Sequence, residues 1–201
     1  MSSTRLKEGL ARTAIVRASI DVFTRRGYEK TSVEDLLKGA GIARRTFYKY
    51  FRSKADVLAA LYKHVTGELV IAIVEASGDV DDLFAGLRLA LDRALDFYVE
   101  NDAIVRILVE EATRSESPLW PLRKRFRATL VQMIDRAMTA ATGQRIDPLV
   151  FLALVSGLEG LALELLDDGV PSAERVTRTK AAMLGLLDVV ANSAADLPPR
   201  T

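Results

Sequence analysis

The side chains best suited to binding a polyanion are clustered in the seven residues from Arg44 to Tyr50. If Phe47 lies inward on a short helix, the opposite face presents three cations and two hydroxyl groups, on Arg44, Arg45, Thr46, Tyr48 and Lys49. Long basic side chains can donate to guanine edges and to phosphates, and hydroxyl groups can donate to phosphate oxygens. This helix is therefore predicted to enter the major groove of double-stranded DNA.

The residues around this helix have the spacing of a helix-turn-helix. Residues 31–51 read TSVEDLLKGAGIARRTFYKYF, which gives a short amphipathic helix, a three-residue turn at 41–43 and a second short helix. Thr31 followed by Glu34 predicts a capping box at the start of the first of these helices. The predicted core of the motif consists of Val33, Leu36, Leu37, Ala40, Ile42 and Phe47.

The charge is divided unevenly along the chain. Residues 1–65 hold 14 Lys or Arg and 6 Asp or Glu, a net charge of +8, whereas the whole chain of 201 residues carries only +1. A basic module beside an acidic remainder is typical of a protein that neutralises phosphates. A chance asymmetry is the alternative explanation of this division.

The sequence lacks the residues that several kinds of catalytic or metal site require. There is no cysteine, which excludes disulfides, thiolate nucleophiles and cysteine-ligated metals, and the single histidine, His64, cannot build a multi-histidine site. We expect His64 to be a packed or surface imidazole rather than a ligand, and we expect no cofactor and no metal. The polar start of the chain does not resemble a secretory signal, so a cytoplasmic location is expected.

The stretch GYEKTSVEDLLKGAGIARRTFYKYFRSKADVL resembles the TetR family of bacterial regulators, both in its helix-turn-helix and in the Phe-x-Ser-Lys entry into the next helix. The resemblance covers about residues 13–62. It implies that Tyr48 and Lys54 hold phosphates, that Thr31 and Ser32 meet the DNA backbone, and that residues 44–46 approach bases. Arg45 departs from the small residue that relatives often carry, and it either reads a guanine or adds a phosphate contact.

Other roles remain open for several of these residues. Half-buried packing is the alternative for Tyr48 and the favoured role of Tyr50. Arg5, Lys7 and Arg12 form either a solvated terminus or an arm that touches phosphates or the minor groove.

Apolar residues recur at helical spacing along the rest of the chain, so the fold is predicted to be all-α with about nine helices. The first runs from about Leu10 to Arg26 and stops at Gly27, and Ser53 caps the fourth. Later helices are expected at roughly 81–99, 102–114, 118–141, 147–167 and 172–192. The chain is expected to divide into a DNA-binding domain, 1–52, and a helical effector-binding and dimerisation domain, 53–201.

The segment from Pro148 to Leu166 is apolar almost all the way round, which predicts burial on more than one side. A membrane span is the competing interpretation, and we reject it because Glu159 and Glu164 lie inside the segment. Together with the last helix, this segment is predicted to form a four-helix interface between two copies of the chain. The predicted interface residues are Leu154, Gly157, Leu158, Leu161, Met183 and Leu187; completion of a monomer core is the alternative.

The resemblance also implies a small-molecule cavity in the C-terminal part. Its predicted lining residues are Tyr98, Leu108, Glu111, Trp120, Phe126 and Met133, although ordinary core packing is the alternative for each. Glu111 places a carboxylate on an apolar stripe, where it could meet a cationic ligand or form a salt bridge with Arg114. The basic run at 123–127 is interpreted as a solvated face.

These features predict a sequence-specific DNA-binding regulator, most simply a homodimeric repressor that a small, largely apolar effector releases from a palindromic operator. A DNA-binding activator or structural protein without an effector is the alternative. A helical enzyme or carrier is the remote alternative, since no nucleophile with its base, metal cluster or phosphate loop is recognisable.

Overall fold

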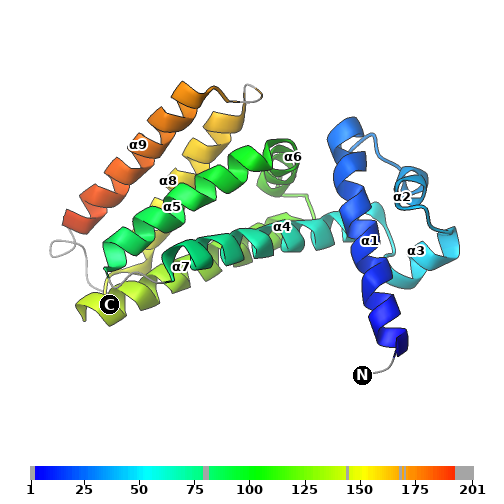
Figure 1. Cartoon of the computed structure of the whole chain (residues 1–201), viewed down its shortest axis with the longest axis horizontal. Coiled ribbons are helices and arrows are strands. Elements are labelled where there is room, and N and C mark those ends of the chain that lie inside the picture. Colours follow the sequence, from blue (N-terminus) through cyan, green and yellow to red (C-terminus); the bar gives the residue numbers. More distant parts are fainter. Residues whose placement is uncertain (1–2, 79–81, 144, 168, 170, 193–201) are drawn as a thin grey trace. The chain divides into compact units, whose positions relative to one another are not determined.

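The computed structural model describes residues 3–78, 82–143, 145–167, 169 and 171–192, and the regular elements in this part of the chain are nine helices. The all-α prediction is confirmed (Figure 1). The helices are α1 (Ser3–Arg26), α2 (Val33–Ala40), α3 (Arg44–Tyr50), α4 (Lys54–Ser77), α5 (Leu83–Glu100), α6 (Asp102–Thr113), α7 (Trp120–Thr142), α8 (Pro148–Asp167) and α9 (Ala173–Asn192).

The chain forms two compact units that do not coincide with the expected boundary at residue 52. The first unit contains residues 1–66 and 103–122, and the second contains 67–102 and 123–201. The long helix α4 contributes to both, and α6 belongs to the first unit although it follows α5 of the second. The functional division into residues 1–52 and 53–201 stays a prediction.

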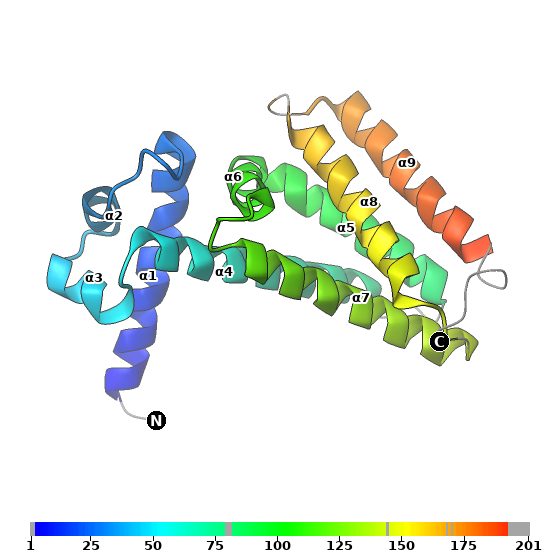
Figure 2. The ribbon, with the colours of Figure 1, turned by 180° about the vertical axis from the view of Figure 1, so that it is seen from behind.

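The core of the first unit joins α1 to the helix-turn-helix. Phe23, Leu36 and Phe47 are fully enclosed, and α4 adds Leu58 and Leu61. Figures 1 and 2 both show α1 lying beside α2 and α3. Burial of large apolar side chains from each of these elements stabilises their arrangement, because each fully buried side chain contributes about 1.5–3 kcal/mol.

In the second unit α8 and α9 lie side by side, and both pack on α5 (Figure 2). One buried cluster joins Leu95 of α5 to Leu165 of α8 and Met183 of α9. A second cluster near the end of α7 contains Met138 and Phe151. These two clusters hold α5, α7, α8 and α9 around the cavity described below.

Two helices, α4 and residues Pro148–Leu166 of α8, are long and apolar enough to cross a membrane by length and composition. Core helices pass the same test. In α8 the apolar residues Phe151, Leu154 and Leu165 are buried within the second unit. The length and composition of these two helices therefore give only weak evidence of a membrane span.

Candidate functional site

The helix-turn-helix begins one residue later than the sequence predicted. Ser32, not Thr31, is the N-cap of α2: its hydroxyl accepts from Asp35 N at 3.2 Å, and Ser32 N donates to the Asp35 carboxylate at 2.9 Å. Thr31 cannot cap the helix because its hydroxyl donates to Gly27 O at 2.7 Å and its exposed fraction is 3%. The predicted capping box of Thr31 and Glu34 is therefore wrong in register.

The turn between α2 and α3 is the one that the sequence predicted. Gly41 has φ +63°, a left-handed conformation that ends α2, and its N–H donates to Leu37 O and Lys38 O. The next helix starts at Arg44. Phe47 is fully buried and contacts the rings of Tyr48 and Phe51, with centroids 5.4 and 5.9 Å away. Burial of Phe47 turns the remaining face of α3 outward.

That outward face carries the predicted cations. Arg44, Arg45 and Lys49 are exposed, Thr46 is half-buried, and Tyr48 has an exposed fraction of 48%. Arg44 forms an ion pair with Glu34 of α2, and the Lys49 ammonium lies 5.7 Å from the Tyr50 ring centroid. Such exposed pairs contribute little to stability, about 0–1 kcal/mol, so these cations can exchange their partners for phosphates at small cost.

The structure gives Thr31 and Lys54 roles inside the first unit. The hydroxyl of Thr31 is engaged by Gly27, as described above. The Lys54 ammonium donates to Tyr28 O at 2.9 Å and to Glu29 O at 3.0 Å, and it lies 4.5 Å from the Tyr28 ring centroid. Both side chains thus fasten the turn at residues 27–30 to the helices that flank it. The contact of Thr31 and Lys54 with the DNA backbone, which the resemblance implied, stays a prediction.

Most side chains of the N-terminal arm are outside the described part of the structure. Those of Arg5 and Lys7 are outside this part of the structure, whereas Arg12 is exposed with its guanidinium 5.3 Å from the Phe51 ring centroid. Tyr50 is half-buried, as expected, and so is His64.

Three of the predicted cavity residues, Leu108, Glu111 and Trp120, belong to the first unit. Leu108 and Glu111 are buried there, and Trp120 is half-buried. None of the three lines the cavity of the second unit. The helical periodicity of Leu108 and Glu111 correctly indicated an inner face, but that face of α6 is buried in the first unit.

Glu111 forms the predicted salt bridge with Arg114. The two side chains are 3.1 Å apart, and the Arg114 guanidinium also lies 3.3 Å from Glu29. The exposed fraction of Glu111 is only 6%. Burial raises the pKa of the Glu111 carboxyl, while Arg114 acts in the opposite direction. Burial, followed by the charges of Glu111 and Glu29, also raises the pKa of Tyr28.

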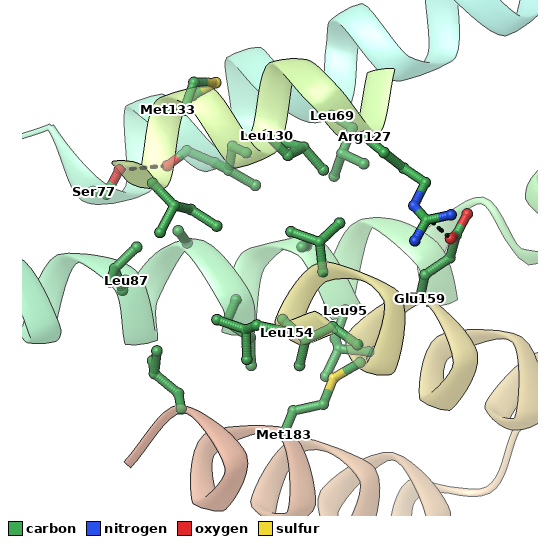
Figure 3. A pocket seen from close by; sticks show the side chains of 18 of the residues that line it. Leu69, Ser77, Leu87, Leu95, Arg127, Leu130, Met133, Leu154, Glu159 and Met183 are labelled. Atoms are coloured by element: carbon green, nitrogen blue, oxygen red, sulfur yellow. Dashed lines mark hydrogen bonds and ion pairs between the residues drawn. The ribbon is translucent and has the colours of Figure 1, made fainter. Parts of the chain in front are cut away.

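The second unit encloses a cavity of about 260 Å³ (Figure 3). Tyr98, Phe126 and Met133 line it, so half of the predicted set is brought together. The other lining residues are mainly aliphatic and come from five helices: Leu69, Ile73 and Val74 of α4, Leu87, Leu91 and Leu95 of α5, Leu130 and Ile134 of α7, Leu154 and Leu158 of α8, and Met183 and Leu187 of α9.

Polar groups lie at opposite sides of this cavity in Figure 3. On one side the Ser77 hydroxyl donates to Ile73 O at 2.8 Å. On the other side Arg127 and Glu159 face each other, with Arg127 Nε 3.7 Å from Glu159 Oε2. Burial, together with the charge of Glu159, raises the pKa of Tyr98 to about 12. Its hydroxyl is thus protonated at neutral pH and can donate a hydrogen bond.

Arg127 and Glu159 were not predicted as cavity residues. The basic run at 123–127 was expected to be a solvated face, but Arg123 and Arg127 are largely buried. A signal was present, because these two arginines lie four residues apart on one helical face and Glu159 is an acidic residue in an apolar helix. The pairing itself spans 36 residues and follows only from the fold.

The predicted interface residues mostly point inward. Leu154, Met183 and Leu187 are buried in the single chain, and Leu158 lines the cavity with them. Leu161 is half-buried against the cluster of Leu95, and only Gly157 is exposed. Leu154, Met183 and Leu187 are thus buried within one chain, and the interface role of the six residues stays a prediction. The large apolar side chains exposed on α8 and α9 are instead Leu149, Leu186 and Val189.

The fold and the exposed cationic helix together define a helix-turn-helix protein with a helical second unit. Residues 15–61 match the model of the tetR family of bacterial regulatory proteins. A fatty acid metabolism regulator protein of Bacillus subtilis (strain 168) is 36% identical over 56 residues, which cover 28% of this chain and 29% of that protein. The transcriptional regulator AcuR of Cereibacter sphaeroides is 40% identical over 52 residues, 26% of this chain and 24% of AcuR.

These two matches span less than a third of each curated relative. Solved structures match more of the chain. A putative TetR-family regulator from Syntrophomonas wolfei has a TM-score of 0.75 at 17% identity, covering 90% of this chain and 96% of the other. One from Rhodococcus sp. has a TM-score of 0.69 at 25% identity, covering 90% and 97%. Residues 15–61 therefore match the tetR family of bacterial regulatory proteins, as the resemblance implied, and the described chain has the same fold as these solved structures.

Proposed function

We propose that this chain is a sequence-specific DNA-binding transcriptional regulator whose α3 enters the major groove. The observation that carries this proposal is the exposed face of α3, where Arg44, Arg45, Tyr48 and Lys49 surround the buried Phe47. In this proposal Arg44, Arg45 and Thr46 approach base edges, and Tyr48 and Lys49 contact phosphates. Ser32, which is exposed and whose hydroxyl donates to the Asp35 carboxylate at 2.7 Å, is proposed to donate to the DNA backbone instead when DNA binds.

The test is duplex binding by variants of this face. Arg44→Ala and Tyr48→Ala should each weaken binding to a selected operator by about 1–3 kcal/mol, and loss of a phosphate contact should reduce the salt slope by about 1. Arg136→Ala, an exposed arginine on α7, is the matched control and should bind as the unaltered protein does. If all three variants bind equally, or if the unaltered protein ignores every duplex at low ionic strength, the proposal fails.

The cavity of the second unit is proposed to bind a small, largely apolar effector that releases the protein from its operator. The support is that α4 lines this cavity with Leu69, Ile73 and Val74 and also begins directly after the helix-turn-helix. An effector that prefers one position of α4 would bias the DNA-binding state through the same helix. Such coupling is typically worth about 1–3 kcal/mol.

A regulator without an effector is the second candidate. Cavity filling separates the two: Ala94→Phe places a ring in the cavity, where Ala94 lines the wall. If an effector acts there, the variant should lose the response of operator binding to a cellular extract that releases the unaltered protein. An unaltered protein that no extract fraction releases would favour the effector-free regulator.

We further propose that two copies associate through the outer face of α8 and α9 and bind a near-palindrome. Support comes from Leu149, with an exposed fraction of 68%, and Val189, with 62%, together with the exposed glycines Gly157 and Gly160. Small residues allow two helices to approach closely, and a twofold pair of reading helices requires related half-sites. We propose a cytoplasmic location, because a repressor acts where its operator is. We also propose that the chain is a regulator without enzymatic activity.

A further inference from the structure

Arg127 of α7 and Glu159 of α8 line the polar side of the cavity, and Arg123, one helical turn before Arg127, pairs with Glu159. Arg123 binds Glu159 with two parallel hydrogen bonds, from Nε to Oε1 at 2.8 Å and from Nη2 to Oε2 at 2.7 Å. This bidentate pair satisfies the carboxylate and neutralises it. Arg127 then remains as a positive charge that no second carboxylate balances in the described part of the cavity wall.

Arg127 is held in place but poorly paired. Its Nη2 donates to the neutral Ser156 hydroxyl, and its Nε lies 3.7 Å from Glu159, too far for a hydrogen bond. That Nε is buried and has no hydrogen-bond acceptor among the described residues. A buried guanidinium without its acceptors is costly, so this position is suited to a bound anion.

The rest of the cavity is suited to a flexible aliphatic group. Apart from Arg127, Glu159 and Ser77, its described wall is formed by leucine, isoleucine, valine, alanine and methionine side chains and by the aromatic Tyr98 and Phe126. The volume of about 260 Å³ lies near the lower end of the range for small-molecule sites, roughly 300–1000 Å³. A flexible alkyl chain can adapt its torsion angles to such a wall of branched aliphatic side chains.

We propose that the cavity binds an amphipathic monoanion, with its alkyl chain among the leucines and its carboxylate on Arg127. The proposal rests on the proposed effector site and names the class of molecule that it takes. A cationic head group would meet Glu159 only by displacing Arg123 from it. A neutral apolar molecule would leave Arg127 uncompensated. The protonated Tyr98 hydroxyl, which also lines the cavity, is available as a second donor to the carboxylate.

The experiment is isothermal titration of the whole protein, without DNA, with three probes of equal chain length: decanoate, decan-1-ol and decan-1-amine. Decanoate should bind about 10- to 100-fold more tightly than decan-1-ol, the factor expected for a buried charge-assisted hydrogen bond. The amine should bind more weakly than the alcohol. Equal affinity for decanoate and decan-1-ol, or no binding of decanoate, would overturn the proposal.

Variants assign the head-group contact. Arg127→Gln should remove the preference for decanoate over decan-1-ol, and Arg127→Lys should restore part of it. Arg125→Gln, an exposed arginine on the same helix, is the matched control and should bind decanoate as the unaltered protein does. Glu159→Gln should bind decanoate more tightly, since it removes a negative charge beside Arg127. Misfolding cannot explain both weaker binding by Arg127→Gln and tighter binding by Glu159→Gln. Thermal unfolding curves show whether each variant is folded.

Failure of this proposal is distinguishable from failure of the proposed function, because the titration contains no DNA. If Arg127→Gln and Arg125→Gln bind decanoate equally, the head-group assignment is wrong, and the cavity remains open to another effector. If decanoate binds through Arg127 but the protein binds no duplex, the ligand class stands and the regulatory function fails.

Discussion

At the scale of single residues, the start of α2 shows how two adjacent hydroxyl residues take different roles. Thr31 and Ser32 both have a hydroxyl that can cap a helix, and each is followed three residues later by a carboxylate, Glu34 or Asp35. Burial of Thr31 against Gly27 O decides the register, since its hydroxyl is no longer available to a helix N–H. The cap therefore falls to Ser32 and Asp35.

Ser32→Ala should lower the free energy of unfolding by about 1 kcal/mol, because the Asp35 N–H loses its acceptor. Glu34→Gln is the control and should change it by no more than about 0.5 kcal/mol, because Glu34 forms only an exposed pair with Arg44. Urea denaturation measures both. A larger effect of Glu34→Gln than of Ser32→Ala would restore the register predicted from the sequence.

Glu111 gives a pH dependence with a defined sign. Since burial raises its pKa in the folded state above the ordinary 4.5, the folded chain holds a proton that the unfolded chain has lost in the interval between the two values. The Glu111 contribution to the free energy of unfolding therefore increases as the pH falls through the folded pKa and is lost as the pH rises through it.

Glu111→Gln should remove this contribution, so that the difference in unfolding free energy between variant and unaltered protein changes with pH between neutrality and about 4.5. Glu116→Gln, an exposed residue between α6 and α7 that does not contribute to the Glu111 shift, should leave the profile of the unaltered protein in place. Urea denaturation at a series of pH values is the measurement. Parallel profiles for Glu111→Gln and the unaltered protein would contradict the raised pKa.

At the scale of elements, two glycines have different backbone conformations, one at the end of a helix and one inside a helix. Gly41 ends α2 at φ +63°, whereas Gly67 lies within α4, and a Cβ would meet no atom within 4 Å at either position. Only backbone conformation then distinguishes the two sites. A left-handed φ is costly for alanine, and a helical φ favours alanine over glycine.

Gly41→Ala should therefore destabilise the protein by about 1–2 kcal/mol, and Gly67→Ala should stabilise it by about 0.5–1 kcal/mol. Thermal or urea denaturation of the two variants side by side provides the measurement. Changes of the same sign would mean that α2 does not end at Gly41 as described or that Gly67 is not in a regular helix.

At the scale of the whole molecule, the outer face of α8 and α9 decides whether two copies associate. Its exposed apolar residues, Leu149 and Val189, differ from the inward residues Leu154 and Met183 on the same two helices. Substitutions on the two faces should therefore have different consequences, one for assembly and the other for folding.

Val189→Asp should convert the proposed dimer to a folded monomer, because a charge in a buried interface is not compensated. Sedimentation velocity should show half the mass, with unchanged helical circular dichroism. Met183→Asp should instead unfold the second unit, since Met183 is buried in the single chain. A Val189→Asp protein that sediments as the unaltered protein does would exclude this face as the interface.

The sequence alone was enough to predict the nine helices of the described chain and the helix-turn-helix, although α1 begins at Ser3 and not near Leu10. Their signals are local: the apolar period, the stop at Gly27, the turn at Gly41 and the cap at Ser53 each act within a few residues. The exposed face of α3 followed from the same period once Phe47 was assigned to the core. These predictions needed no information about distant neighbours.

Only the tertiary structure decided which inner face meets which neighbour. Leu108, Glu111 and Trp120 were expected at the cavity, but all three belong to the first unit, where α6 buries Leu108 and Glu111. An almost uniformly apolar helix such as α8 has no local signal that separates a face inside the chain from a face toward a partner. The encounter of Arg127 with Glu159 likewise depends on how α7 and α8 pack, because no period within either helix encodes a contact between them.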